Sequence, residues 1–320
     1  MFFENVLGVE YSGIPPPRLR YSGIPPPRLR DIAPVHLLRH VPVEVRNCGM
    51  EHAARQQTPS VTTSPGSWVA QEEADAVKGR NDNLYQQPLF REAAGAALRP
   101  GGRELTVHAL ALCGFEQESS GEGKCALDVG CGAGATLALL QERGFCVTGV
   151  DPDAAMLEES RSATRGLVQL LRGHAEALPL PDASQDLVLC ECVLSLCSAL
   201  RQAVSECFRV LAPGGHIVLA DVIRYDGCPA VRVPGLRSCL SGAPTLPRLR
   251  ETLIREGFRL EYEEAHDRAL TELGARLILG GESLDGLGRW LGFGCGGGPS
   301  SRDLLRSLGY VLLTARKEDA

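Results

Sequence analysis

The chain has 320 residues, of which 44% are hydrophobic, so it can bury the core of one large α/β domain with a smaller appendage. Its net charge of -6 argues against a nucleic-acid backbone as the main partner. No apolar run has the length of a membrane span, and the N-terminus, Met1-Phe-Phe-Glu-Asn5, lacks the features of a secretory signal. We therefore expect a cytoplasmic protein that binds neither nucleic acid nor membrane.

The N-terminal part of the chain differs in character from the remainder. The decapeptide of residues 11–20 is repeated without change as residues 21–30. Two copies are too few for a solenoid, and Pro-rich sequence favours extended segments. A recognition tail, a disordered extension and translated upstream DNA are all open interpretations of residues 1–82, and we assign residues 83–320 to the folded domain.

The folded part alternates between two kinds of apolar pattern. Helical spacing over residues 88–113 is interrupted at Arg99-Pro-Gly-Gly102, which predicts two helices flanking a turn. Further along, strands are expected at 125–129, 145–150, 167–171, 186–194, 216–222, 258–262 and 310–316, and helices at 135–143, 153–164, 199–211 and 268–279. This order predicts a doubly wound α/β fold, with a mostly parallel sheet covered by helices on both faces.

Twelve cysteines are more than such a chain usually carries. Cys190-x-Cys192 and the isolated Cys295 lack the paired C-x2-C blocks of a zinc site, so we predict no metal site. Several cysteines lie in expected core strands, which favours reduced, buried thiols that pack as small apolar residues. Core packing is the interpretation for Cys190, Cys197 and Cys207.

A glycine loop follows the first expected strand, in the sequence Asp128-Val-Gly130-Cys131-Gly132-Ala-Gly134. Glycines let the backbone turn tightly and approach a ligand at the positive end of the next helix. The spacing also fits the dinucleotide fingerprint, and Asp151, which ends the second strand, can accept ribose hydroxyls in either kind of site. The loop alone therefore leaves NAD and S-adenosylmethionine (SAM) as alternatives.

Two further features favour SAM. Asp128 stands two residues before the first glycine, and the segment from Arg209 to Asp221, Arg-Val-Leu-Ala-Pro-Gly-Gly-His-Ile-Val-Leu-Ala-Asp, resembles that of class I SAM-dependent methyltransferases of the type 11, UbiE-like group. The resemblance implies a Rossmann-like, seven-stranded sheet with an antiparallel C-terminal strand pair, methyltransferase activity and SAM as the cofactor. The cofactor-binding residues that it implies are Asp128, Gly130, Cys131, Gly132, Gly134, Asp151, Pro152, His174, Ala175 and Glu191.

His174 departs from the pattern of many members of that family, which carry an aspartate there to accept a hydrogen bond from the adenine amino group. An imidazole nitrogen of His174 can accept the same bond, or the ring can merely shield the adenine. The backbone N–H of Ala175 remains available to the adenine edge in either case.

The acceptor is expected near the carboxyl ends of the fourth and fifth strands. There, Cys192-Val-Leu-Ser-Leu and Cys239-Leu-Ser-Gly-Ala are similar in order and spelling to arsenite methyltransferases. The resemblance implies that Cys192 and Cys239 hold trivalent arsenic, a soft centre that prefers thiolate ligands. The Arg99-Pro-Gly-Gly box together with Cys190-Glu-Cys192 also resembles a subgroup of methyltransferases from anaerobic bacteria.

We therefore predict a methyltransferase that acts on a small, thiophilic acceptor such as arsenite. Methylation of carbon or oxygen in a small metabolite, with the cysteines as packing, is the alternative within enzymes. A non-catalytic SAM-binding protein is a third interpretation, because a fold does not fix a function. The connection from Val222 to Thr245 is expected to cover the site, while His266 and Asp267 either line it or lie on the surface.

Overall fold

The computed structural model describes residues 84–228, 239–240, 242–281 and 306–318. Three subjects of the sequence analysis lie outside these ranges: residues 1–82, most of the segment between Val222 and Thr245 that was expected to cover the site, and Cys295. Within them, no helix combines the length and the apolar character that crossing a bilayer requires.

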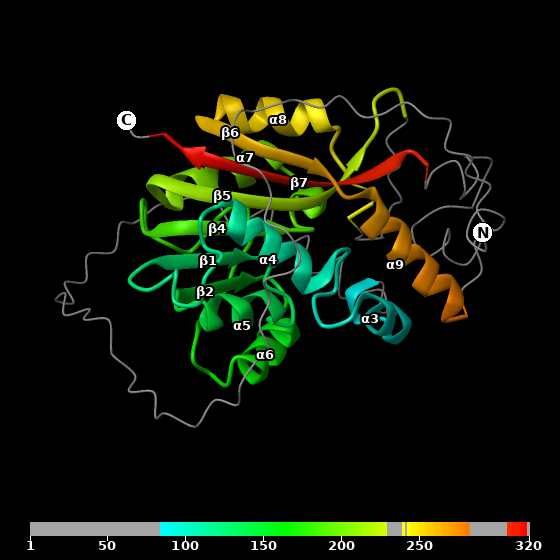
Figure 1. Ribbon diagram of the computed structural model, residues 1–320, viewed down its shortest axis with the longest axis horizontal. Helices are drawn as coiled ribbons and strands as arrows, with labels where there is room; N and C mark the ends of the chain where they lie inside the picture. Colours follow the sequence, from blue (N-terminus) through cyan, green and yellow to red (C-terminus); the bar gives the residue numbers. More distant parts are fainter. Residues whose placement is uncertain (1–83, 229–238, 241, 282–305, 319–320) are drawn as a thin grey trace, which may run out of the picture. The chain divides into compact units, whose positions relative to one another are not determined.

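A seven-stranded sheet with the order β3-β2-β1-β4-β5-β7-β6 forms the centre of the described chain (Figure 1). Neighbouring strands are parallel from β3 to β5, whereas β7 is antiparallel to both β5 and β6. This confirms the predicted doubly wound sheet with its antiparallel C-terminal pair. The strands are β1 (Cys125–Val129), β2 (Cys146–Asp151), β3 (Gln169–Arg172), β4 (Gln185–Glu191), β5 (Leu211–Arg224), β6 (Phe258–Ala265) and β7 (Leu308–Lys317).

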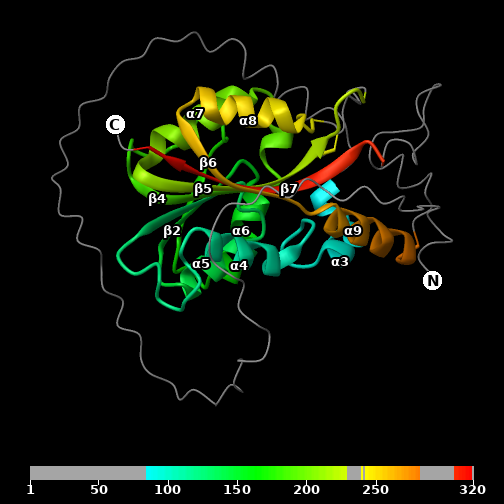
Figure 2. The ribbon, with the colours of Figure 1, turned by 45° about the horizontal axis from the view of Figure 1, so that its top comes forward.

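Helices cover both faces of the sheet, as Figure 2 shows. On one side lie α3 (Pro88–Ala94), α4 (Gly102–Leu112), α5 (Ala135–Glu142), α6 (Ala154–Ala163) and α9 (Asp267–Leu279), and on the other lie α7 (Leu200–Val210) and α8 (Leu246–Arg255). Two short 3-10 helices, η1 (Leu84–Gln86) and η2 (Leu194–Leu196), complete the described elements.

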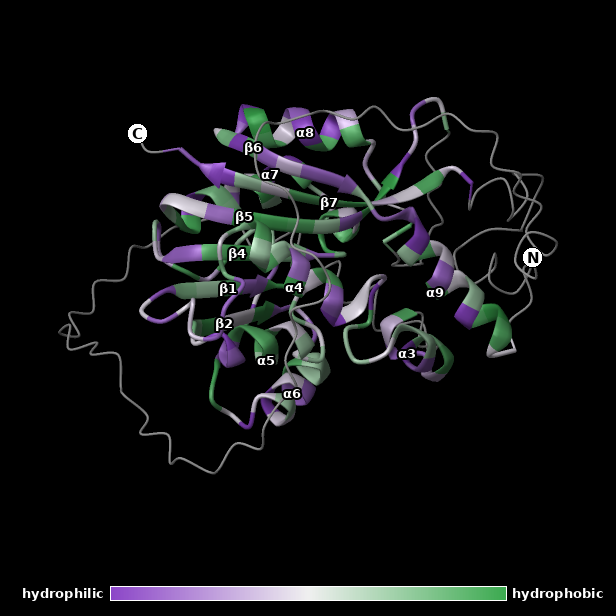
Figure 3. Ribbon diagram, in the orientation of Figure 1, coloured by the Kyte–Doolittle hydropathy of each residue, from purple (hydrophilic) through white to green (hydrophobic). Residues whose placement is uncertain are grey.

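Each face of the sheet has its own apolar core, because successive side chains of a strand point in opposite directions. In β5, Val218, Ala220 and Val222 pack into the core below α4 and α5, while Ile217 and Leu219 pack into the core below α7. Figure 3 shows this apolar character along the middle of the central strands. Burial on both faces is what a parallel sheet between two helical layers requires.

The largest differences from the sequence prediction lie in β4, β5 and α8. β4 ends at Glu191 because Cys192 adopts a φ of +58°, which turns the chain into η2. β5 begins at Leu211, and its pairing with β4 shifts register around the Pro-Gly-Gly segment. The helix α8 was not predicted, although Leu249 and Leu253 recur at helical spacing and are fully buried.

Candidate cofactor and acceptor site

The glycine loop between β1 and α5 turns through three left-handed residues. Gly130, Gly132 and Gly134 have φ values of +69°, +51° and +88°, a region that residues with a side chain rarely adopt. A Cβ atom at Gly130 would lie 2.5 Å from a methyl group of Val193, and one at Gly134 would lie 2.9 Å from the Cα of Ser160. A Cβ at Gly132 would have no neighbour within 4 Å. The loop is therefore closely packed at both ends and open in the middle.

Hydrogen bonds from β2 and α6 fix this loop. The N–H groups of Gly130 and Cys131 donate to the Val150 carbonyl at 2.7 and 3.1 Å. The Ser160 hydroxyl donates to the carbonyl of Gly132 at 2.6 Å, and the Cys131 thiol lies 3.8 Å from the same hydroxyl. The thiol of Cys131 thus packs behind the loop, so its part in binding a cofactor would come through the backbone.

Asp151, at the carboxyl end of β2, lies beside the loop. One carboxylate oxygen accepts the N–H of Gly132 at 2.9 Å, and the other accepts the N–H of Asp153 at 2.8 Å. Burial raises the pKa of Asp151, although these two N–H groups and the nearby His174 oppose the rise. A carboxylate has about four lone-pair positions, so two remain for ribose hydroxyls.

Pro152, His174 and Ala175 lie around Asp151. The carbonyl of Pro152 accepts from the Arg172 side chain at 3.1 Å, His174 is exposed, and Ala175 is buried. The structure therefore brings the predicted ribose and adenine residues to one end of β2 and β3.

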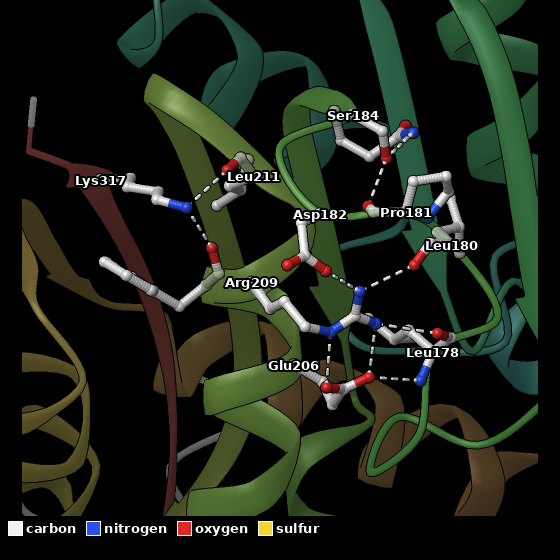
Figure 4. A network of polar contacts seen from close by, with 11 residues as sticks. Leu178, Leu180, Pro181, Asp182, Ser184, Glu206, Arg209, Leu211 and Lys317 are labelled. Carbon is white, nitrogen blue, oxygen red and sulfur yellow. Dashed lines mark hydrogen bonds and ion pairs between the residues drawn. The ribbon is translucent and has the colours of Figure 1, made fainter. Parts of the chain in front are cut away.

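Arg209 holds the segment that follows His174 and Ala175 (Figure 4). From the last turn of α7, its guanidinium donates to the carbonyls of Leu178 and Leu180 at 3.0 and 2.8 Å. It also pairs with Glu206 and Asp182, each at 2.7 Å, and these two carboxylates raise the pKa of Arg209. The arginine of the Arg-Val-Leu-Ala-Pro-Gly-Gly motif thus fixes the segment directly after the residues expected to contact adenine.

Glu191, at the end of β4, belongs to a buried polar network. Its carboxylate pairs with Arg99 at 2.8 Å, and both side chains are 4% exposed. The hydroxyls of Thr106 and Thr136 donate to the two Glu191 oxygens at 2.9 and 2.7 Å. Burial acts to lower the pKa of Arg99, but the Glu191 carboxylate and the other acidic groups nearby together outweigh burial, so the pKa is raised. The network connects β4 to α4 and α5, and binding of a cofactor by Glu191 stays a prediction.

Asp128, within β1, is 3% exposed and lies near this pair. Burial and the neighbouring Glu191 carboxylate raise its pKa, and Arg99 opposes that rise. Arg99 is therefore the cation shared by two buried carboxyl groups.

Cys192 and Cys239 meet at one cavity of about 60 Å³. Cys192 follows β4 directly, whereas Cys239 lies beyond β5, and the two thiols lie close to each other. The remaining walls are mostly apolar and come from η1, α3, α9 and β5, with Tyr85, Val222, Leu240, Leu270, Leu273 and Leu277 among the lining residues. The sequence-predicted pair therefore shares one small enclosure.

Two tyrosine hydroxyl groups lie near the thiols. The Tyr310 hydroxyl lies 3.5 Å from the Cys192 sulfur, and Tyr85 lines the same cavity as Cys239. The adjacent Cys239 thiol, together with burial, raises the pKa of the Cys192 thiol well above its ordinary value. Burial also raises the pKa of both tyrosines. Cys192, Tyr85 and Tyr310 are therefore neutral at pH 7.

Asp221 lies beneath this group, fully buried in β5. Its carboxylate accepts the N–H and the hydroxyl of Ser195 at 3.0 and 2.5 Å, and the N–H of Val222 at 2.7 Å. Burial raises its pKa to about 6. Asp221 thereby fixes η2, the segment that follows Cys192.

Other candidates from the sequence lie away from the cavity. Cys190 and Cys207 are fully buried with their sulfurs 3.7 Å apart in the core beside α7. The Cys197 thiol donates to the Val193 carbonyl at 3.3 Å. Asp267 accepts from the Tyr225 hydroxyl and the Tyr310 N–H, so it joins β5 and β7 instead of lining the site.

Sequence reasoning did not select Tyr85, Tyr310 or Arg99 as site residues. Arg99 had a signal, because it opens the Arg-Pro-Gly-Gly turn between two expected helices. The two tyrosines had none: Tyr85 lies in a mostly polar segment, Tyr310 lies in an apolar strand, and the partners of both are distant in the chain.

Known methyltransferases match this chain in sequence. The profile of a methyltransferase domain matches residues 127–219. An O-methyltransferase of Pyrenophora dematioidea is 31% identical over 229 residues, which are 67% of this chain and 82% of that protein. A malonyl-(acyl-carrier protein) O-methyltransferase of Serratia marcescens is 39% identical over 150 residues, 44% of this chain and 55% of that protein.

An arsenite methyltransferase of Halobacterium salinarum is 31% identical over 146 residues, which are 42% of this chain and 37% of that protein. The chain thus spans about half the length, or less, of these last two relatives. Among solved structures, that of the cyclase SpnF superposes with a TM-score of 0.57 at 23% sequence identity. The match covers 74% of this chain and 94% of the SpnF chain. A geranyl diphosphate C-methyltransferase from Streptomyces coelicolor has a TM-score of 0.51 at 16% sequence identity. That match covers 67% of this chain and 80% of the methyltransferase chain. Both share the fold.

Proposed function

The chain belongs to the class I SAM-dependent methyltransferases, and we propose that its acceptor is a small thiophilic species, with arsenite as the best candidate. The observation that carries the proposal is the meeting of Cys192 and Cys239 at one small cavity. Two thiols from separate segments are the ligands that a trivalent arsenic centre prefers.

The residues of the glycine loop fit the cofactor of this family. SAM supplies an electrophilic methyl group on a sulfonium sulfur. The open face of Gly132 admits close approach of a ligand to the backbone, and Asp151 retains acceptor positions for ribose hydroxyls. The segment held by Arg209 would place His174 and Ala175 at the adenine.

Arsenite can bind to protonated thiols. As(OH)₃ condenses with a thiol by forming an As–S bond and breaking an As–O bond, and the thiol proton leaves with the hydroxide as water. Two such steps, at Cys192 and Cys239, consume no base and leave no net charge in the apolar cavity. The raised pKa of Cys192 is therefore compatible with binding. The arsenic lone pair stays free, and positioning it in line with the methyl group is the main task of the site.

Methylation of oxygen or carbon in a small metabolite is the second candidate. The mostly apolar lining of the cavity favours it, as does the O-methyltransferase that this chain matches over 82% of its length. In that case Cys192 and Cys239 would only shape the wall, and replacing them would change the fit of the acceptor without removing a bond.

Binding of arsenite without SAM separates the two candidates. Equilibrium dialysis with arsenic quantified by mass spectrometry should show one As(III) per chain, and Cys192→Ser or Cys239→Ser should weaken binding at least about tenfold, since each removes one As–S bond. Cys146→Ser, which replaces an exposed thiol, and Cys197→Ser are matched controls expected to bind normally. Equal binding by both cavity variants and by the controls would eliminate the thiophilic acceptor while leaving the methyltransferase assignment intact.

A further inference from the structure

Three potential metal ligands converge where α4 crosses the end of β6 and the start of α9. They are His108 on α4, Glu264 near the end of β6, and His266, which immediately precedes α9. Their ligand atoms all lie within 4.8 Å of one another. None of the three is among the residues that line the cavity of Cys192 and Cys239.

The backbone explains why these side chains meet. Glu264 and His266 are two residues apart, so they project from the same side of the extended chain. Glu264 Oε2 lies 3.0 Å from His108 Nε2 and 3.1 Å from His266 Nε2. The Tyr262 hydroxyl donates to the same oxygen at 3.4 Å, and the Tyr262 ring packs edge-on against His108. Two imidazole nitrogens and a carboxylate are therefore already directed at one point.

We propose that His108, Glu264 and His266 bind a divalent transition-metal ion such as Zn²⁺, with water in the remaining positions. Two imidazoles and one carboxylate are ligands for which Zn²⁺, Co²⁺ and Ni²⁺ compete well, whereas Ca²⁺ and Mg²⁺ prefer oxygen alone. His108 and Glu264 are more than two-fifths exposed, so an ion can enter and keep its water ligands. The Glu264 carboxylate supplies the negative charge that favours a cation at this place.

The electrostatics of Glu264 agree with this assignment. Burial acts to raise its pKa, but hydrogen bonding to His108 and the proximity of His266 outweigh burial, so the pKa is lowered. The carboxylate is thus ionised at neutral pH, as a metal ligand must be.

A bound ion would join two elements that build the methyltransferase site. α4 carries Thr106, which donates to Glu191, and α9 supplies Leu270, Leu273 and Leu277 to the cavity wall. The metal would hold the start of α9 against α4 from outside the cavity. Because the ion would lie outside the cavity, it would stabilise the fold and would take no part in methyl transfer.

Co²⁺ titration of the reduced full-length protein tests the proposal, because the spectrum reports the ligand type. Nitrogen and oxygen ligands give weak visible d–d bands, whereas cysteine ligands add strong near-ultraviolet charge transfer. We expect one Co²⁺ per chain with visible bands and no sulfur charge transfer, displaced by Zn²⁺. His108→Ala, His266→Ala and Glu264→Gln should each weaken binding at least about tenfold, because each removes a direct ligand.

His216→Ala is the matched control, since His216 of β5 pairs with Glu261 of β6 at 3.2 Å but lies outside the cluster. It should bind Co²⁺ like the unaltered protein, and so should Cys192→Ser. Circular dichroism checks the fold of every variant, and Glu264→Gln, which preserves size, decides the matter if a histidine variant does not fold. Absence of binding, spectra dominated by sulfur charge transfer, or unchanged affinity in Glu264→Gln would overturn the proposal. None of these results bears on arsenite binding by Cys192 and Cys239.

Discussion

The glycine loop after β1 is positioned by its own backbone, whereas the cavity at Cys192 and Cys239 is enclosed by side chains from distant segments. In the loop, left-handed glycines and N–H groups bonded to β2 set the shape. Around the cavity, thiols, phenols and leucines from η1, β4, β7 and α9 meet. A local sequence motif can thus form the site for a cofactor that is common to a family. The acceptor site, in contrast, depends on contacts between segments that only the complete fold brings together.

The buried network of Glu191 lies between these two regions, and breaking it should give the largest loss of stability. Glu191→Ala leaves Arg99 charged and buried without its principal partner, so we expect the free energy of unfolding to fall by about 3–5 kcal/mol. Urea denaturation measures this loss. The double variant Arg99→Met with Glu191→Met should be more stable than Glu191→Ala, and a loss below about 1 kcal/mol in Glu191→Ala would mean that the pair does not hold the two regions together.

Asp221 should give the acceptor region its own pH dependence. Below pH 3.8, its ordinary pKa, the carboxyl is protonated in both the folded and the unfolded chain. Between pH 3.8 and about pH 6, the Asp221 carboxyl is ionised in the unfolded chain but still protonated in the folded chain. Its contribution to the free energy of unfolding therefore decreases as the pH rises through this range, and above about pH 6 it no longer changes. The total loss is at most about 3 kcal/mol. Comparing Asp221→Asn with the unaltered protein by urea denaturation across this range should show a difference that falls with pH, and a constant difference would contradict the raised pKa.

Two glycine substitutions should separate packing from ligand binding in the cofactor region. Gly134→Ala forces a Cβ against the Ser160 backbone, so we expect about 2–3 kcal/mol of destabilisation. Gly132→Ala meets no protein atom and should cost about 1 kcal/mol from its left-handed conformation. Because that Cβ enters the space assigned to SAM, calorimetry should show SAM affinity reduced at least about tenfold in Gly132→Ala. Normal SAM affinity in this variant would place the cofactor elsewhere.

The two regions also differ in how far the sequence could predict them. The alternation of strands and helices and the turn of the glycine loop follow from local patterns, since apolar runs and glycine spacing act over a few residues, whereas the antiparallel end was predicted through the family resemblance. The sequence selected Cys192 and Cys239 through a family resemblance, but it gave no sign that Tyr85 and Tyr310 flank them. Contacts between segments so far apart depend on the packing of the complete fold, which a local pattern does not encode.

The helix α8 and the end of β4 also show that local sequence patterns do not define every element. The Leu249 and Leu253 spacing was present, and Pro247 lies in the first turn, where proline suits a helix, yet no element was predicted there. The apolar run after Glu191 suggested a longer strand, whereas the chain turns at Cys192, whose N–H donates to the Ala220 carbonyl at 2.7 Å. That turn brings the Cys192 thiol into the cavity, so the deviation from the predicted strand is part of the site.

Transfer of a deuterated methyl group from labelled SAM to arsenite, followed by mass spectrometry of the products, tests the central claim most directly. We predict labelled methylarsenic species with the unaltered protein and with Cys146→Ser, and none with Cys192→Ser or Cys239→Ser, while calorimetry shows that all four bind SAM alike. Methylation of arsenite at an undiminished rate by both cavity variants, or its absence in the unaltered protein alongside methylation of an oxygen or carbon acceptor, would contradict the claim.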